Sequence, residues 1–335
     1  MDMRAFPLVI LTPVFEDRAA SAQLFAALGA RYGKEVFVLV VDDGSVRAPP
    51  EPDDLRAAGL CGEILVLRRN IGHQRAIATG LGYLADRLAP DQNVVIMDCD
   101  GEDLPDSIAE LVAGLDDPEV DAVVAQRTAR VETRRFKIFY ALYKLLFRLL
   151  SGRPIGFGNF MALRASTARR LAAMSETAIH VAGALIASRL RLDHRPLARG
   201  PRYDGQSKMN FVGLVLHGFR GLMVFVEDVL VRLGIACAII AGLAVSGALA
   251  AVGLKLFGFS TPGWFSIALG ILVLIFMQTG ALSLMTLMLA GVMRGQAVPP
   301  AESYQAPIDR VLATHPAVTS AVTPVGKTAD GGAGA

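Results

Sequence analysis

The chain has 335 residues, of which 53% are hydrophobic and 19% charged, and its mean hydropathy is +0.45. This apolar content exceeds that of an ordinary soluble domain, so we expect part of the chain to lie in lipid. The 33 basic and 31 acidic residues leave a net charge of +2, which argues against nucleic acid as a partner. The three cysteines lack CxxC spacing, which excludes a disulfide framework and a zinc knuckle.

Over the first 150 residues, apolar runs rich in Val and Ile alternate with longer stretches of helical period. The runs lie at 8–14, 35–41, 63–67, 93–98 and 121–126, and the helical stretches at 18–32, 52–59, 72–88, 105–115 and 131–150. Uninterrupted apolar strands that alternate with helices are typical of a mostly parallel sheet covered on both faces. In such an α/β fold the ligand site lies at the carboxyl ends of the strands.

Acidic side chains follow the fourth of these strands, in the sequence MDCDGEDLP. Residues two apart in an extended segment point the same way, so Asp98 and Asp100 can converge on one point. Two carboxylates and the oxygens of a diphosphate commonly hold Mg²⁺ or Mn²⁺. The alternative is that Asp103 or Asp106 caps the following helix, but capping would leave Asp98 and Asp100 unused.

Other ligand signals are weak. The stretch GARYGKE at 29–35 departs from a phosphate-binding loop in its spacing and in its last residue, and no GxGxxG occurs. Four histidines lack ligand spacing, and we interpret them as structural residues: His73, His180, His194 and His217. A nucleoside triphosphatase or a Rossmann dehydrogenase is therefore not indicated.

A basic run at 126–137 carries five Arg or Lys and precedes an apolar stretch in which Lys144 and Arg148 are four residues apart. This pattern predicts a helix that lies flat on a bilayer, with its basic end near anionic lipid or a lipid phosphate. An amphipathic core helix with solvated charges is the alternative.

Two segments are long enough to span a membrane, because 233–254 and 264–293 contain no charged residue. Arg220 and Arg232 precede the first segment and Arg294 follows the second, whereas the link between them has one charge. The positive-inside rule therefore places both ends of the hairpin in the cytoplasm.

Six motifs occur in order along the chain: PVFED, VDDGS, RRNIGHQRAIATGL, MDCDGEDLP, GFGNFMALR and RYDGQSKMN. Together they resemble the family 2 glycosyltransferases with a GT-A fold, and most closely the polyprenyl-phosphate glycosyltransferases. The resemblance covers about residues 5–295. It implies metal-dependent, inverting transfer of a sugar from a nucleotide sugar to a membrane polyprenyl phosphate, such as undecaprenyl phosphate, with Mg²⁺ or Mn²⁺ as cofactor.

The resemblance also implies roles for the matching positions. Near the nucleoside it places Pro13, Phe15, Asp17, Asp42, Asp43 and Asp98. As ligands of the metal it suggests Asp98, Asp100 and Glu102. For the acceptor phosphate it suggests Arg127, Arg134 or Arg135, Arg202, Ser207 and Lys208. Two departures bear on the sugar more than on the fold. Glu16 and Asp17 replace Asn-Glu, and Asn159 replaces a common Asp.

These observations predict a GT-A catalytic domain at 1–208 and an amphipathic juxtamembrane segment at 209–231. A two-helix transmembrane hairpin at 232–294 and a disordered tail at 295–335 follow. We expect a multi-pass protein of the inner membrane, with the catalytic domain and both termini in the cytoplasm.

A phosphate acceptor is consistent with this picture, because a phosphate monoester is already ionised and needs cations rather than a general base. Three alternatives are another lipid acceptor, a processive synthase and a catalytically silent membrane scaffold that binds nucleotide sugar. Processive synthases resemble one another in a Gln/Arg-x-x-Arg-Trp motif, whereas the only tryptophan here, Trp264, opens a predicted span. The intact acidic and basic motifs argue against a scaffold. The sugar, the nucleotide and the formation of a homo-oligomer are left open.

Overall fold

The computed structural model describes residues 2–127, 145–154, 156–203, 218–259, 263–295 and 304–314. These residues form one eight-stranded sheet in the order β7-β5-β6-β4-β1-β2-β3-β8. Its strands are β1 (Leu8–Val14), β2 (Val36–Asp42), β3 (Cys61–Leu67), β4 (Asn93–Ile96), β5 (Ala122–Arg127), β6 (Met161–Arg164), β7 (Leu192–Leu197) and β8 (Ile308–Ala313). Only β6 and β8 run antiparallel to their neighbours within this sheet, which confirms the predicted mostly parallel arrangement.

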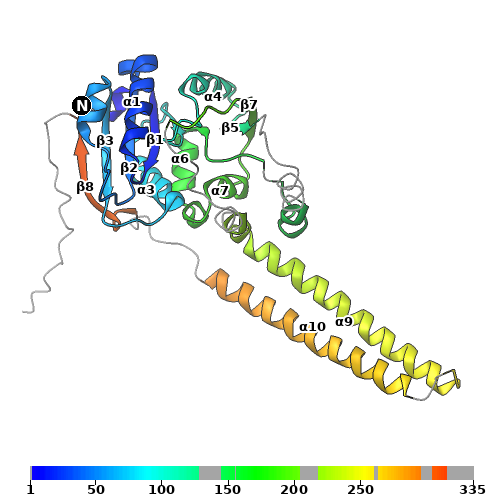
Figure 1. Ribbon diagram of the computed structural model, residues 1–335. Coiled ribbons are helices and arrows are strands. Elements are labelled where there is room, and N and C mark those ends of the chain that lie inside the picture. The colour runs from blue at the N-terminus through cyan, green and yellow to red at the C-terminus, as the bar shows by residue number, and fades with distance from the viewer. Residues whose placement is uncertain are drawn as a thin grey trace, which may run out of the picture.

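Helices cover both faces of the sheet (Figure 1). They are α1 (Arg18–Tyr32), α2 (Pro52–Ala57), α3 (His73–Ala85), α4 (Ile108–Ala113), α6 (Ala165–Ala172) and α7 (Val181–Ala187). Successive residues of β1 point to opposite faces, so Val9 and Leu11 pack with α3, α6 and α7, whereas Ile10 packs with α1, α2 and α4. All seven residues of β2 are buried, which explains why the central strands are uninterrupted apolar runs.

The order of the strands reverses beside β1. The chain proceeds from β1 to β2 and β3 on one side and then returns to place β4 on the other side of β1. The loops that follow β1 and β4 therefore diverge at this point of the sheet, which is where open α/β folds bind their ligands. The acidic motif after β4 lies in this position.

Two long helices, α9 (Val226–Leu256) and α10 (Trp264–Gly295), pack side by side and project from the sheet domain (Figure 1). Val226–Leu256 and Trp264–Leu289 are each long and apolar enough to cross a membrane, and they are the two such segments among the described residues. The first helix begins seven residues before the predicted span, with Glu227 and Asp228 in its first turn. Acidic side chains in that position favour a helix start.

The expectation of a disordered tail is wrong for residues 304–314. Strand β8 pairs antiparallel with β3 and completes the edge of the sheet (Figure 1). The nitrogen Nε of Arg68 donates to the Ile308 carbonyl at 3.2 Å, and the amide of Gly62 donates to Oγ1 of Thr314 at 3.2 Å. The run IDRVLA has the β-branched residues of a strand, but the surrounding Ala, Pro and Thr conceal it in a compositional analysis.

Candidate active site

Two aspartates at the end of β2 organise the loops around the site. Oδ1 of Asp42 accepts a hydrogen bond from the Ser45 amide at 2.9 Å. The carboxylate of Asp43 accepts from the amides of Ile71 at 2.7 Å and Gly72 at 3.0 Å, and so joins this loop to the start of α3. Burial raises the pKa of both carboxyls. Both carboxylates therefore help to hold the loops of the site in place.

The loop that follows β2 is held by Glu16, which the sequence motif indicated only as a departure from the family pattern. Its carboxylate accepts from the amides of Val46, Arg47 and Ala48, at 2.8, 3.0 and 2.8 Å for the shortest contacts. These donors, with the Val46 amide foremost, hold the pKa of Glu16 below its usual range. Glu16 has a left-handed backbone, with φ of 48°, an uncommon conformation that these contacts fix.

The acidic segment after β4 folds into a tight turn through its own carboxylates. Oδ2 of Asp103 accepts from the Asp98 amide at 3.0 Å, and Oδ1 of Asp100 accepts from the Glu102 amide at 3.0 Å. Asp103 is buried, and the N-cap position of the next helical turn, Pro105–Ser107, belongs to Leu104. The capping alternative therefore does not describe Asp103.

Two arginines bind this acidic turn. The Arg202 guanidinium reaches Oδ2 of Asp100 through an Nη at 2.8 Å and Oε1 of Glu102 through Nε at 3.1 Å. Arg199 forms an ion pair with the other oxygen of Glu102. The Arg199 pKa is lowered by burial, against the opposing effect of Asp100. Arg202 was predicted to bind an acceptor phosphate, whereas Arg199 was not predicted.

The chemistry of Asp98 and Asp100 fits a hard divalent cation, since both offer carboxylate oxygens at the end of one strand. Glu102 is placed differently, because both of its oxygens contact arginines. Among the described residues, no three His, Cys, Asp or Glu side chains gather closely enough to hold a metal. A cation bound to Asp98 and Asp100 would therefore take its other ligands from water and substrate, as Mg²⁺ commonly does.

His73, which was interpreted as a structural residue, lies within the site and contacts one of its carboxylates. As the first residue of α3, it places Nε2 3.2 Å from Oδ1 of Asp98 and 3.0 Å from Nδ2 of Asn159. Burial opposes its protonation, but the carboxylates of Asp98, Asp43 and Asp100 together outweigh burial and raise the His73 pKa. Asn159 also contacts Nε2 of Gln74 at 3.4 Å, so the motif GFGNF is tied to the start of α3.

The other predicted residues lie along the same edge or outside the described chain. Pro13 is buried within β1, Phe15 is 43% exposed directly after it, and Asp17 precedes α1. Arg127 is the last residue of β5. Arg134, Arg135, Ser207 and Lys208 lie outside the described residues. The structure therefore brings Asp100, Glu102 and Arg202 into contact, in the turn that also contains Asp98.

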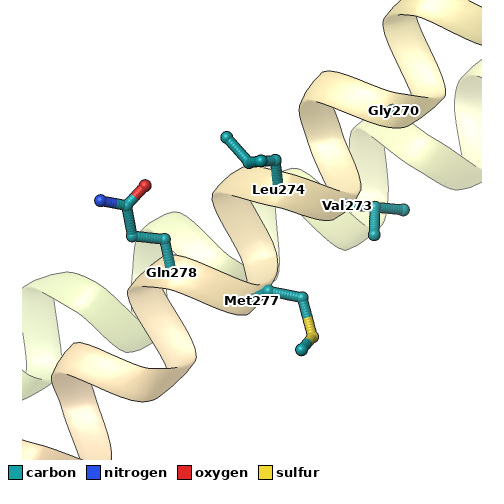
Figure 2. Close-up of a pocket in the computed structure, with 5 residues that line it drawn as sticks. All are labelled: Gly270, Val273, Leu274, Met277 and Gln278. Carbon is teal, nitrogen blue, oxygen red and sulfur yellow. The ribbon is translucent and has the colours of Figure 1, made fainter.

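Shallow hollows on α10 do not belong to this site. One is lined by Gly270, Val273, Leu274, Met277 and Gln278, whose side chains spread over the outer surface of the helix (Figure 2). A second follows on the same helix at 281–289. Four of the five residues in the first hollow are apolar or glycine, which fits shallow grooves between side chains on a long apolar helix.

Comparison with known proteins places this geometry in a family. Residues 9–170 match the model for Glycosyl transferase family 2. Among solved structures, glucosyl-3-phosphoglycerate synthase from Mycobacterium tuberculosis, in complex with Mn²⁺, UDP-glucose and phosphoglyceric acid, is 15% identical. The aligned region covers 68% of this chain and 82% of the synthase chain, with a TM-score of 0.49. A mannosyltransferase from Pyrobaculum calidifontis, in complex with GDP-Man and Mn²⁺, is 18% identical, covers 90% and 78%, and has a TM-score of 0.40. No curated protein matches the sequence.

The mostly parallel sheet, with acids after β4 at the point where the strand order reverses, is that of a GT-A glycosyltransferase domain. The family match spans residues 9–170, just under half of the chain, and it supports a nucleotide-sugar glycosyltransferase. The family match carries this assignment, because the identities and TM-scores of the solved structures are too low to transfer a substrate.

Proposed function

We propose that the protein transfers a sugar from a nucleotide sugar to the phosphate of a membrane polyprenol, with inversion at the anomeric carbon. Undecaprenyl phosphate is the acceptor to test first. The observation that carries this proposal is the position of Arg202. It contacts the acidic turn at one end of the described segment 156–203, and the chain then leads toward two membrane-length helices.

The proposed reaction is a single displacement. An oxygen of the acceptor phosphate forms a bond to the anomeric carbon as the bond from that carbon to the diphosphate oxygen breaks, and the nucleoside diphosphate leaves. The acceptor phosphate is already ionised near neutral pH, so no side chain has to remove a proton. Arginine side chains would orient it through paired hydrogen bonds. Ser207 and Lys208 belong to the same proposal by their place in the sequence.

A divalent cation, Mg²⁺ or Mn²⁺, would be held by Asp98 and Asp100 and would supply electrostatic stabilisation of the leaving diphosphate. The donor set supports this role, because it consists of oxygen atoms and already attracts a guanidinium cation. On the nucleoside side, Phe15 offers an exposed ring beside Asp42 and Asp43, whose hydrogen bonds fix the surrounding loops. His73 would hold the Asp98 carboxylate in place.

The membrane placement is part of the proposal. Helices α9 and α10 would form a hairpin through the inner membrane, with the catalytic domain and both termini on the cytoplasmic side. The charges support this orientation, since Arg220, Arg232 and Arg294 lie at the domain end of the hairpin and Lys255 lies at its far end. A cytoplasmic site would have access to nucleotide sugars and to lipid phosphates at the membrane surface.

The test is transfer of radiolabelled sugar from a panel of nucleotide sugars to undecaprenyl phosphate by purified full-length protein in detergent. We expect label in the lipid phase with Mg²⁺ or Mn²⁺, and none with EDTA. Asp100→Asn should lower transfer by at least about a hundredfold, since it removes a carboxylate charge that would hold the divalent cation beside the leaving diphosphate. Asp106→Asn is the matched control, because the Asp106 side chain is 87% exposed in the next turn.

Two results would count against the proposal. If short-chain or non-polyprenyl lipids accept the sugar and undecaprenyl phosphate does not, the acceptor class is wrong. If folded protein binds a nucleotide sugar but labels no lipid with any donor, the protein acts on a different acceptor or serves as a scaffold.

A further inference from the structure

Two arginines occupy the side of the acidic turn at which a cation is expected. Arg202 spans Asp100 and Glu102 with its fork, and Arg199 binds Glu102 from the other side. The four side chains are between 13% and 25% exposed. At this exposure water screens the ion pairs only in part, so the contacts are stronger than those of a surface salt bridge.

The backbone holds these arginines against the turn. The Gly200 amide donates to the Glu102 carbonyl at 3.0 Å, and the Tyr203 amide donates to the Asp100 carbonyl at 2.8 Å. The two segments also pack closely, because a Cβ at Gly200 would lie 2.4 Å from the Gly101 carbonyl oxygen. These contacts therefore hold the backbone of Arg202 beside the turn, within reach of Asp100 and Glu102.

Asp100 and Glu102 consequently have different surroundings. The carboxylate of Asp100 contacts Arg202 and the Glu102 amide. A divalent metal ion can therefore replace the single guanidinium that Asp100 binds. Glu102 contacts Arg199 and Arg202 at once, and a metal ligand would have to give up both contacts. The geometry therefore indicates that Glu102 positions the two arginines.

We propose that Arg202 is a resident cation of the metal site, which occupies Asp100 until a divalent cation binds there with the nucleotide diphosphate. Arg199 and Glu102 are positioning residues that hold Arg202 in this place. This inference rests on the proposed function. Its consequence is an order of binding: Arg202 leaves Asp100 when the donor and cation arrive, and only then is its guanidinium available to an acceptor phosphate.

The test is the affinity of the full-length protein for Mn²⁺, measured by electron paramagnetic resonance of free Mn²⁺ without nucleotide or acceptor. Arg202→Gln should bind Mn²⁺ roughly tenfold more tightly, the factor that corresponds to one charge-assisted hydrogen bond at Asp100. Arg202→Lys keeps the charge but not the fork, so its affinity should fall between those of wild type and Arg202→Gln.

The matched control is Arg195→Gln. It removes the same charge from β7, where Arg195 pairs with Asp193 at 2.8 Å, and its Mn²⁺ affinity should stay within about twofold of wild type because the charge is solvent-screened. If Arg202→Gln leaves Mn²⁺ affinity unchanged or weakens it, or if Arg195→Gln tightens it equally, the inference is wrong. Merely damaging the loop would not tighten metal binding.

Glu102→Gln separates the positioning role from metal ligation. A direct ligand should lower Mn²⁺ affinity at least about tenfold when replaced, whereas a positioning residue for Arg202 should leave it equal or tighter. Thermal unfolding of each variant identifies misfolded protein. None of these measurements depends on turnover. Mn²⁺ binding can therefore contradict the role of Arg202 while wild-type protein still transfers sugar to lipid. Conversely, the proposed transfer can fail while the Mn²⁺ results agree with the inference.

Discussion

At the scale of single residues, Gly101 allows the acidic turn to pack against the segment 199–203, which carries Arg199 and Arg202. Its φ is +90°, and a Cβ there would lie 2.8 Å from the ring of Tyr203. Gly101→Ala therefore combines backbone strain of about 1–2 kcal/mol with displacement of Tyr203. We expect sugar transfer to fall at least about tenfold, because Arg202 lies next to Tyr203 and would lose its place on Asp100.

Gly59→Ala is the control for this prediction. Gly59 also has a positive φ of +71°, but a Cβ there meets nothing within 4 Å. The substitution should lower the free energy of unfolding by about 1 kcal/mol without changing the KM for the donor. Equal losses of transfer in both variants would show that strain alone, and not the contact with Tyr203, accounts for the effect of Gly101→Ala.

The residues of the site were predictable where chemistry follows a strand end. Asp98 and Asp100 could be recognised from their spacing after an apolar run, and the arginine in RYDGQSK from its motif. His73 and Arg199 could not be recognised, because each meets its partner across a long sequence separation. The position of His73 at the start of the helix in RRNIGHQ was the available signal. For Arg199 the signal was a second arginine three residues before Arg202.

At the scale of elements, β8 covers an edge of the sheet with a segment that returns to the sheet after the two long apolar helices α9 and α10. The OH of Tyr304 donates to Asp86 at 2.8 Å, and Arg56 donates to the Thr314 carbonyl at 2.7 Å. A chain that ends after residue 303 should lose these contacts and leave β3 as an open edge. We expect the melting temperature to fall by at least about 5 °C, with a greater tendency to aggregate.

The matched shortened chain for this comparison ends after residue 315, so that it keeps β8 and the contacts of Thr314. It should unfold within about 2 °C of the full chain. Similar melting temperatures for the two shortened chains would mean that the β3 edge does not depend on β8.

A second element-scale prediction concerns the junction of β5 and β7. Oδ2 of Asp121 accepts from the amide and Nε of Arg191 at 2.9 and 3.0 Å. The hydrogen bond from the Arg191 guanidinium holds the pKa of Asp121 below its usual range. A lowered pKa in the folded state stabilises the fold above pH 3.8, and this contribution is lost as pH falls through the folded value. Asp121→Asn should therefore melt below wild type at pH 7, and the difference should shrink at acidic pH. A difference that stays constant from pH 7 to pH 3 would contradict this assignment.

At the scale of the whole molecule, the sequence predicted the layers of the fold better than its edges. The central strands are buried on both faces, and burial imposes the apolar runs that made them recognisable. Strand β7 is LDHRPL, and most of its residues are only partly buried or exposed, so it carries no such run. Strand β8 lies far along the chain beyond two long apolar helices, and no local pattern indicates that it returns to β3.

A second feature of the whole molecule is the connection between the catalytic domain and the first long apolar helix. The buried ring of Phe225, at the start of α9, lies edge-on to Phe147 with centroids 5.9 Å apart, and the Arg153 guanidinium lies 5.3 Å from it. An Nη of Arg153 also donates to the Ile186 carbonyl of α7 at 3.1 Å. This cluster joins a helix at 145–151, α7 and α9. The catalytic domain is therefore packed directly against the first membrane-length helix.

Phe225→Ala should loosen this joint while leaving the nucleotide side of the sheet intact. The cavity should cost about 3–5 kcal/mol of local stability. Transfer to undecaprenyl phosphate should fall at least about tenfold, because the catalytic domain would no longer be held in a fixed position relative to α9 and the lipid. Donor affinity, measured by calorimetry with Mn²⁺, should change less than about threefold. Phe219→Ala, whose ring is 58% exposed, should keep most of the stability. If Phe225→Ala weakens donor binding as much as lipid transfer, the cluster supports the catalytic domain itself rather than its connection to the membrane.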